Sequence, residues 1–247
     1  MNAFQAVRAL GPIDARGIRR DGTLSWMIFL PLLSAVILRL GVPPLTDRLL
    51  AQSGFNLTPY YPVMLAYFFV VMAPVVFAVL IGFLLLDEKD DKTLTALQVT
   101  PLSLNAYLAY RIIVPVALTI GMMFILFPLA GLGDLLLGQI LVVAIAAAPL
   151  SPMFALYLAS FAQNKVQGFA LMKLSGVILF VPIFAFFVQS RWELAFGIIP
   201  TYWPMKVYWL LASGQTSDLW LYVLIAVLYQ SAVTALFARR FNKLMLR

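Results

Sequence analysis

The chain has 247 residues, of which 63% are hydrophobic and only 11% are charged, and its mean hydropathy is +0.97. A soluble domain carries about 25% charged residues, so this chain has too little polar surface for water, and we predict an all-α integral membrane protein. The sequence contains no cysteine and no histidine, which excludes disulfide bonds and removes the commonest general base and metal ligand. We therefore predict no metal and no bound cofactor.

Residues 1–22 are polar and rich in arginine, and they lack the short apolar run and cleavage site of a signal peptide. Phe4, Val7 and Leu10 share one helical face, which predicts a helix lying in the membrane interface. Gly11-Pro12 is expected to break this helix. The alternative is a solvated leader with no fixed structure. In either case we expect the segment to stay on the mature protein.

Six apolar runs are long enough to cross the hydrocarbon of a bilayer, which takes about 20 helical residues. We predict a single transmembrane domain over residues 1–247 with spans at 23–40, 60–86, 106–130, 135–161, 166–188 and 219–238. With a cytoplasmic N-terminus, all of the 17 basic residues lie on the cytoplasmic side except Arg39, Arg48, Arg191 and Lys206. Since cytoplasmic segments are enriched in Lys and Arg, both termini are predicted to be cytoplasmic.

The last outer connection, residues 189–218, is too apolar for a free loop. Its aromatic residues include Trp192, Phe196, Tyr202, Trp203, Tyr208 and Trp209. Re-entrant helices that dip into the outer leaflet would account for them, because exposed irregular backbone is not tolerated in hydrocarbon. An aromatic belt at the membrane interface is a compatible alternative.

The most polar stretch between two spans lies at residues 86–101. Its charged residues are Asp87, Glu88, Lys89, Asp90, Asp91 and Lys92. The acids are expected to occupy the first turns of a short helix, where the macrodipole favours negative charge. Leu94 and Leu97 give this helix a small apolar face, and Thr100-Pro101 ends it because a residue before proline avoids the α conformation. For a membrane protein of no particular family, a solvated surface turn is the favoured interpretation.

Several short motifs follow one another along the chain. They are Asp14-Ala15-Arg16, Arg19-Arg20-Asp21, Glu88-Lys89-Asp90, Thr93-Leu94, Leu97, Thr100-Pro101-Leu102, Tyr107, Asn164-Lys165-Val166-Gln167-Gly168, Met172-Lys173 and Ile199-Pro200-Thr201-Tyr202-Trp203. In this order they resemble the permease subunits of ABC exporters of the second type, and in particular the bacterial fluoroquinolone-export permeases. The resemblance extends over nearly the whole chain.

The resemblance implies a half-transporter in the bacterial inner membrane. Two permeases, identical or related, would enclose a path, and each would rest on a cytoplasmic ATPase subunit that holds ATP and Mg²⁺. This chain lacks the G-x-x-x-x-G-K-[ST] loop that cradles ATP phosphates, so we expect a transport subunit rather than an enzyme. The ATPase would dock on a coupling helix at 87–101, through Asp87, Glu88, Lys89, Asp90, Lys92, Thr93, Leu94, Leu97, Thr100 and Pro101.

Apolar and aromatic residues on the second and fifth spans suit a hydrophobic or amphipathic cargo, drug-like or lipid-like. The predicted path residues are Phe68, Met72, Phe77, Phe180, Phe184 and Phe187, although each fits lipid contact or core packing equally well. Lys173 joins them as a charge inside the fifth span. For Lys173, and for Arg111 in the third span, a side chain that snorkels to the cytoplasmic surface is the favoured alternative.

Two other classes of function are compatible with six spans. A membrane-embedded enzyme acting on lipids would need a cluster of intramembrane carboxylates or a nucleophile–base pair. The acids of this chain lie instead at span ends and in loops. A scaffold protein without transport activity would need no ATPase partner.

Overall fold

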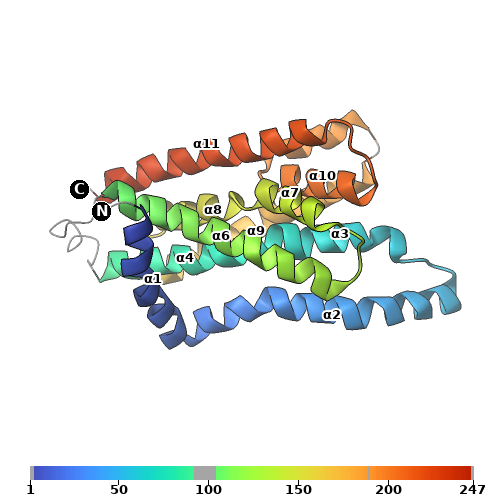
Figure 1. Ribbon diagram of the computed structural model, residues 1–247, viewed down its shortest axis with the longest axis horizontal. Coiled ribbons are helices and arrows are strands. Elements are labelled where there is room, and N and C mark those ends of the chain that lie inside the picture. The colour runs from blue at the N-terminus through green and yellow to red at the C-terminus, as the bar shows by residue number, and fades with distance from the viewer. Residues whose placement is uncertain (1–2, 92–103, 189, 246–247) are drawn as a thin grey trace.

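The computed structural model describes residues 3–91, 104–188 and 190–245, and within them every regular element is a helix. The first half contains α1 (Ala3–Arg20), α2 (Gly22–Ser53), η1 (Thr58–Tyr60), α3 (Tyr61–Leu65), η2 (Ala66–Val71), α4 (Met72–Asp90) and α6 (Leu104–Ala130). The second half contains α7 (Leu137–Ala147), α8 (Leu150–Phe161), α9 (Lys165–Phe180), η3 (Val181–Phe187), η4 (Arg191–Ile198), α10 (Tyr202–Ala212) and α11 (Leu219–Met245). Figure 1 shows their arrangement.

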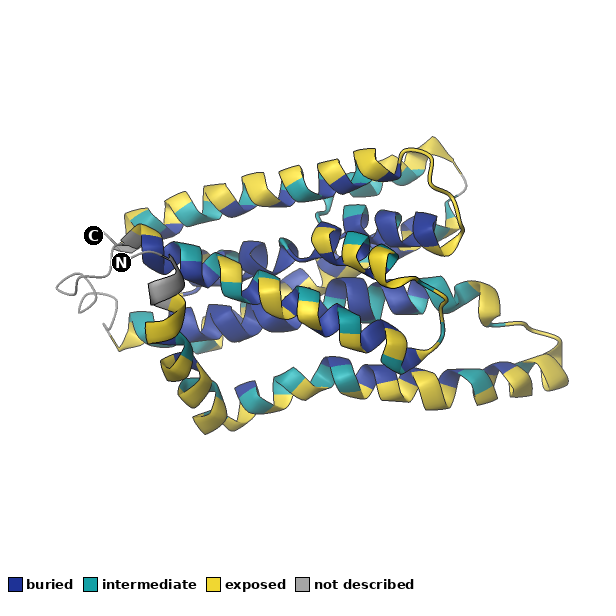
Figure 2. Cartoon of the chain, in the orientation of Figure 1, coloured by how far each residue is buried: buried dark blue, intermediate teal, exposed yellow. Residues whose placement is uncertain are grey.

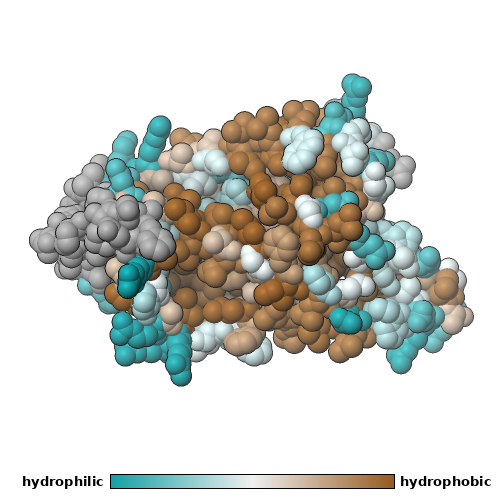
Figure 3. Space-filling view, in the orientation of Figure 1, coloured by the Kyte–Doolittle hydropathy of each residue, from teal (hydrophilic) through white to brown (hydrophobic). Residues whose placement is uncertain are grey.

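The described part of the chain has six helical stretches long and apolar enough to cross a membrane, which confirms the number of predicted spans. They run over Gly22–Ser53, Thr58–Asp90, Asn105–Ala130, Leu137–Phe161, Lys165–Phe187 and Leu219–Leu244. The long helices lie side by side, and a hydrophobic belt separates polar groups at the two ends of the molecule (Figures 1 and 3). The protein is therefore a multi-pass membrane protein.

The second span forms the centre of the bundle. Most of α4 is buried, and it packs against α8 above all, and also against α6, α2 and α9 (Figure 2). Gly82 permits the close approach of α8, because a Cβ atom there would lie 3.3 Å from the carbonyl oxygen of Ala155. The span begins with the short α3 and a turn of π-helix, η2, a type of insertion that is frequent at functional sites.

The first helix differs from the prediction at one point. α1 continues through Gly11-Pro12, so the predicted break there is wrong. Pro12 lies on the exposed side of the helix, so the hydrogen bond that proline cannot make does not leave a buried polar group unpaired. α1 runs across the ends of the long helices, packed against α6, α2 and α4 (Figure 1).

The first span is also longer than predicted. α2 continues past Pro43-Pro44 to Ser53, where Gly54 ends it with a φ of 68°. This left-handed conformation is the one that glycine adopts readily at a helix C-cap. The prolines near residue 43 are therefore accommodated within the helix instead of ending it.

The connection at 189–218 is partly helical, and its aromatic residues have two different environments. Tyr202, Tyr208 and Trp209 of α10 are buried, in a helix that packs against α11, α7 and η2. Trp192 of η4, by contrast, is 80% exposed. The apolar character of this segment therefore serves core packing in α10 and surface contact in η4.

Candidate functional site

Arg111, near the start of α6, is the largest side chain that the described part of the chain buries completely, with 1% of its surface exposed. The start of α6 lies at the end of the bundle where both termini are found (Figure 1), and Asp14 within α1 and Glu88 at the end of α4 reach Arg111 there. A buried guanidinium requires paired charges and hydrogen bonds, because desolvation of an unpaired ion costs several kcal/mol. Its surroundings supply both.

Two carboxylates from different helices pair with this guanidinium. Asp14 of α1 accepts hydrogen bonds from Nη1 at 2.6 Å and from Nη2 at 3.3 Å. Glu88, in the last turn of α4, accepts a further bond from Nη2. Arg111 therefore joins α1 and α4 to α6.

Two tyrosines complete the cluster on the side of α6. Tyr110 donates its hydroxyl to Asp14 at 2.6 Å, and Tyr107 donates its hydroxyl to Glu88. Tyr107 also accepts a hydrogen bond from Arg111 Nε at 3.2 Å, and both tyrosine rings lie 5.2 Å from the guanidinium carbon. We call these five residues, Asp14, Glu88, Tyr107, Tyr110 and Arg111, the Arg111 cluster.

A second group of charges ties the end of α4 to α9 and α2. Lys165, the first residue of α9, contacts Asp87 at 2.9 Å and Asp21 at 2.8 Å. Asp21 is also the N-cap of α2, where its Oδ1 accepts from the backbone N–H groups of Thr23 and Leu24. Lys89 donates to the carbonyl of Ala162, just after α8, at 3.0 Å. Three consecutive residues, 87–89, thus connect the last turn of α4 to its neighbours.

The hydrogen bond from Lys165 holds the pKa of the Asp21 carboxyl below its ordinary value of 3.8. A carboxyl whose pKa is lower in the folded state stabilises the fold above its unfolded pKa, and this stabilisation is lost as the pH falls through the folded pKa. The ion pair therefore contributes at neutral pH and disappears in acid below pH 3.8.

Asp21→Asn should accordingly lower the free energy of unfolding by up to about 1 kcal/mol at pH 7, because the pair is partly exposed and asparagine still caps the helix. The difference from wild type should close in acid below pH 3.8. Thermal unfolding in detergent over a pH series measures it. Asp47→Asn, at an exposed position of α2, is the control. A difference of equal size at neutral and acid pH would contradict the assignment.

The predicted coupling residues divide into two groups. Asp87, Glu88, Lys89 and Asp90 lie in the last turn of α4, so the acids end a helix instead of starting one. The apolar second span simply continues as a helix into the charged residues, since no glycine or proline interrupts it. The remaining predicted docking residues lie outside the described residues: Lys92, Thr93, Leu94, Leu97, Thr100 and Pro101.

Glu88 was predicted to face the ATPase, but its carboxylate points to Arg111 and Tyr107 within the chain. Asp87 and Lys89 are likewise engaged with neighbouring elements. Asp90 and Asp91, in contrast, are exposed. The inward-facing members of the set are therefore suited to hold the end of α4 in position, and the exposed ones to contact another molecule.

The predicted path residues do not form one surface. Phe77 is buried between helices, while Phe68 and Met72 are partly buried against the core. Phe180, Phe184 and Phe187 are 40–56% exposed on one side of the bundle. Phe180 makes an edge-to-face contact with Tyr67 of the second span, with ring centroids 5.2 Å apart, and the rings of Tyr60 and Phe187 lie 6.1 Å apart at a tilt of 31°. An aromatic contact between the second and fifth spans therefore exists.

The two cations inside predicted spans have different surroundings. Lys173 is exposed, as a snorkelling side chain requires. For Arg111 the favoured prediction of snorkelling is wrong, because its guanidinium is buried and paired. Sequence reasoning also missed Asp14, Asp21 and Lys165 as members of the site. One signal in the sequence pointed to such partners. An arginine within an apolar span is costly unless another charged or polar group pairs with it.

Comparison with known proteins agrees with this architecture. The sequence model of a family described as "Fluoroquinolones export permease protein Rv2686c-like" matches residues 14–238. Two relatives from Mycobacterium tuberculosis, fluoroquinolones export permease protein Rv2686c of strain H37Rv and MT2760 of strain CDC 1551, are each 30% identical over 242 residues. Those alignments cover 96% of this chain and 94% of each relative. The chain therefore belongs to the Rv2686c-like family of fluoroquinolone export permeases and is a membrane permease.

Proposed function

We propose that this chain is the transmembrane permease subunit of an ATP-driven ABC exporter, with ATP hydrolysis on a separate ATPase subunit. The observation that carries the proposal is the way the last turn of α4 is held. Asp87, Glu88 and Lys89 connect it to α9, to α6 and to the end of α8 immediately before segment 92–103. A force applied to that segment would reach several spans at once.

The geometry of these contacts favours collective movement over local bending. Glu88 shares Arg111 with Asp14, so α4 cannot shift relative to α6 without disturbing α1 as well. Leaving any one of these charges buried without its partner would cost about 3–5 kcal/mol. The elements around the cluster are therefore expected to move as one body when the ATPase subunits close.

The arrangement in the cell follows from the same proposal. Both termini and segment 92–103 would face the cytoplasm of a bacterial inner membrane, and α1 would lie in the membrane interface with Arg16, Arg19 and Arg20 exposed. Two copies, identical or related, would enclose the path. Residues 87–101 would contact the ATPase, with 87–90 as the last turn of α4, and α10 with η4 would be the re-entrant helices of the outer leaflet.

The cargo we propose is hydrophobic or amphipathic. The relatives from Mycobacterium tuberculosis are named for the export of fluoroquinolones, which are compounds of this kind. The exposed aromatic side chains of Phe180, Phe184 and Phe187, together with Tyr67 and Tyr60 of the second span, offer a surface for such a compound. No other class of function gains an observation of comparable weight, because both carboxylates of the Arg111 cluster are already paired.

Leu97→Asp tests the docking role. When this variant is co-expressed with the ATPase, the rates of permease-stimulated ATP hydrolysis and of fluoroquinolone efflux from cells should fall about tenfold or more. This is the effect expected when a central residue of an interface is changed. Leu136→Asp, at a 72% exposed leucine between α6 and α7, is the matched control and should retain both activities. If Leu97→Asp still associates with the ATPase and still exports the compound, the proposal is refuted. If the wild type associates with the ATPase but shows no efflux, a scaffold function is favoured.

A further inference from the structure

A cleft of about 650 Å³ opens between α1, α2, α4 and α6. It lies where α2 diverges from the bundle and α1 crosses over to meet it (Figure 1). Phe77 of α4 and Phe29 of α2 line its sides, and Gly121 and Ala117 of α6 line its back. Phe77, predicted from the sequence to face the cargo path, therefore faces this separate space.

The lining of the cleft is almost entirely apolar. Among the described residues that line it, Arg19 and Ser25 are the only polar ones. The Ser25 hydroxyl is already used, because it donates to the carbonyl of Ile18 at 2.7 Å. A site for a drug-sized ligand normally contains several polar groups that fix the orientation of the ligand, and the interior of this cleft offers no free one.

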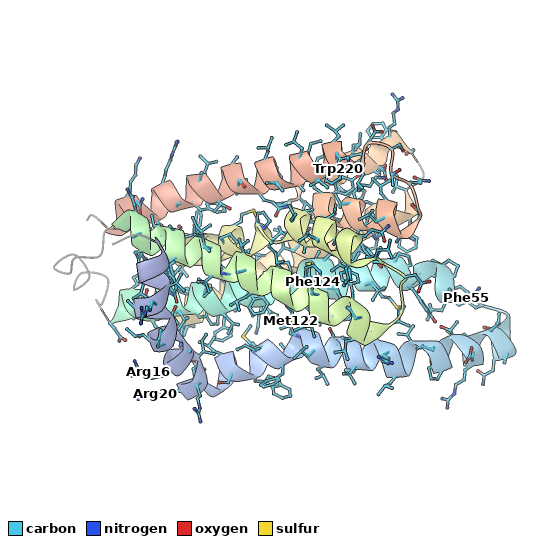
Figure 4. All side chains as sticks on the ribbon, in the orientation of Figure 1. Arg16, Arg20, Phe55, Met122, Phe124 and Trp220 are labelled. Atoms are coloured by element: carbon cyan, nitrogen blue, oxygen red, sulfur yellow. The ribbon has the colours of Figure 1, made fainter. Side chains whose placement is uncertain are left out.

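Arg19 differs from the rest of the lining. It is exposed at the end of α1, and within the described part of the chain its side chain has no carboxylate or hydrogen-bond partner. Arg16 and Arg20 extend from the same end of α1, beside the start of α2 (Figure 4). The cleft thus combines a long apolar interior with a positively charged rim.

We propose that this cleft is a binding site for an anionic phospholipid, with an acyl chain between α2 and α6 and the lipid phosphate on Arg19. Three of the four helices that form the cleft, α2, α4 and α6, are long and apolar enough to cross the membrane, so acyl chains are the solvent beside it. Basic residues at a membrane surface attract anionic headgroups, and no described residue pairs with Arg19. The lipid would fill the space that separates the first half of α2 from α4 and α6. This site does not depend on the transport function proposed above.

Two substitutions test the headgroup and the acyl chain separately. Arg19→Gln removes the charge at the rim, with Arg20→Gln as a control of equal charge change outside the lining. Gly121→Leu fills the interior without a clash at the Cβ atom, because nothing lies within 4 Å of a Cβ built there. Gly41→Leu is its matched control, since that glycine of α2 is equally unobstructed but does not line the cleft. Ala117→Phe fills the same space should Gly121→Leu not yield a monodisperse protein.

Native mass spectrometry of the full chain in detergent, titrated with phosphatidylglycerol and with phosphatidylcholine, measures the binding. The wild type should retain one phosphatidylglycerol in preference to phosphatidylcholine. Arg19→Gln should lower the affinity for phosphatidylglycerol about fivefold, the size expected for one basic residue at an anionic surface. It should also abolish the preference for phosphatidylglycerol over phosphatidylcholine. Gly121→Leu should remove the bound molecule of either lipid. Both controls should bind as the wild type does.

Four results would overturn the proposal. Equal losses of phosphatidylglycerol affinity in Arg19→Gln and Arg20→Gln would show that the lipid responds to a diffuse surface charge and not to a site. Retention of the bound lipid in both cleft-filling variants would place the lipid elsewhere. Displacement of the lipid by a fluoroquinolone would make the cleft a cargo site, and displacement by inorganic phosphate alone would leave only an anion site at its rim.

Discussion

Replacing Arg111 with methionine should lower the free energy of unfolding by about 3–5 kcal/mol. The variant leaves Asp14 and Glu88 facing each other in a buried site without the cation that both of them contact. It also removes the hydrogen bond from Arg111 Nε to Tyr107 and the guanidinium that lies against two tyrosine rings. Methionine fills a similar volume, so the loss reports the charge and not a cavity.

Lys173→Met is the control for this prediction, because it removes a cation from another span at an exposed position. It should change the free energy of unfolding by less than about 0.5 kcal/mol, the usual range for surface substitutions. Unfolding in mixed detergent micelles, followed by tryptophan fluorescence, measures both variants. Equal stability of the two variants would mean that the Arg111 cluster does not hold α1, α4 and α6 together.

Gly82→Leu should have the second-largest effect, a loss of about 1–3 kcal/mol. Gly82 lies where α4 packs on α8, and a Cβ atom there would come within 3.3 Å of the Ala155 carbonyl oxygen and of the Leu158 Cβ. The backbone oxygen cannot rotate away as a side chain can. The two helices would have to separate to admit a leucine, and the contacts of the central span would loosen.

Gly176→Leu separates this packing effect from helix propensity. The glycine is exposed on α9, and nothing lies within 4 Å of a Cβ built on it. Both variants gain the same intrinsic helix preference over glycine, up to about 1 kcal/mol. The difference between their unfolding free energies therefore measures the packing of α4 on α8, and no difference would mean that the two helices accommodate the side chain freely.

The Arg111 cluster also gives the proposed coupling a physical basis. Segment 92–103 follows residues that contact α6, α9 and the end of α8, and Arg111 of α6 is in turn paired with Asp14 of α1. A docking surface attached to an isolated helix end would pass little of a displacement to the rest of the protein. A docking surface attached to these contacts would pass it to most of the bundle.

The spans and their order could be predicted from the sequence because hydropathy is a local property. A run of about 20 apolar residues buries itself in lipid whatever its neighbours are, and all six predicted runs correspond to helices. The amphipathic α1 was recognisable for the same reason, from the spacing of Phe4, Val7 and Leu10 along one helical face. Its continuation through Gly11-Pro12 was not, since that depends on which side of the helix faces its neighbours.

The partners of the buried charges could not be predicted in this way. Arg111 and Asp14 are 97 positions apart, and Lys165 and Asp21 are 144 apart. No local pattern relates such positions, because the pairs form only when α1 crosses the bundle and α9 returns to the same end. The sequence showed that an arginine in the third span costs free energy. It was also compatible with a side chain that snorkels to the cytoplasmic surface and needs no partner.

Composition and hydropathy by themselves determined that this protein crosses a membrane with six helices, and short motifs indicated its family. The tertiary structure alone decided that Glu88 turns inward to Arg111, that Phe77 lines a cleft beside α2, and that Arg19 lies at the rim of that cleft. The physical reason is the same in each case. Transfer of a helix into lipid depends on its own residues, whereas the pairing of a charge or the opening of a cleft depends on how separate helices meet.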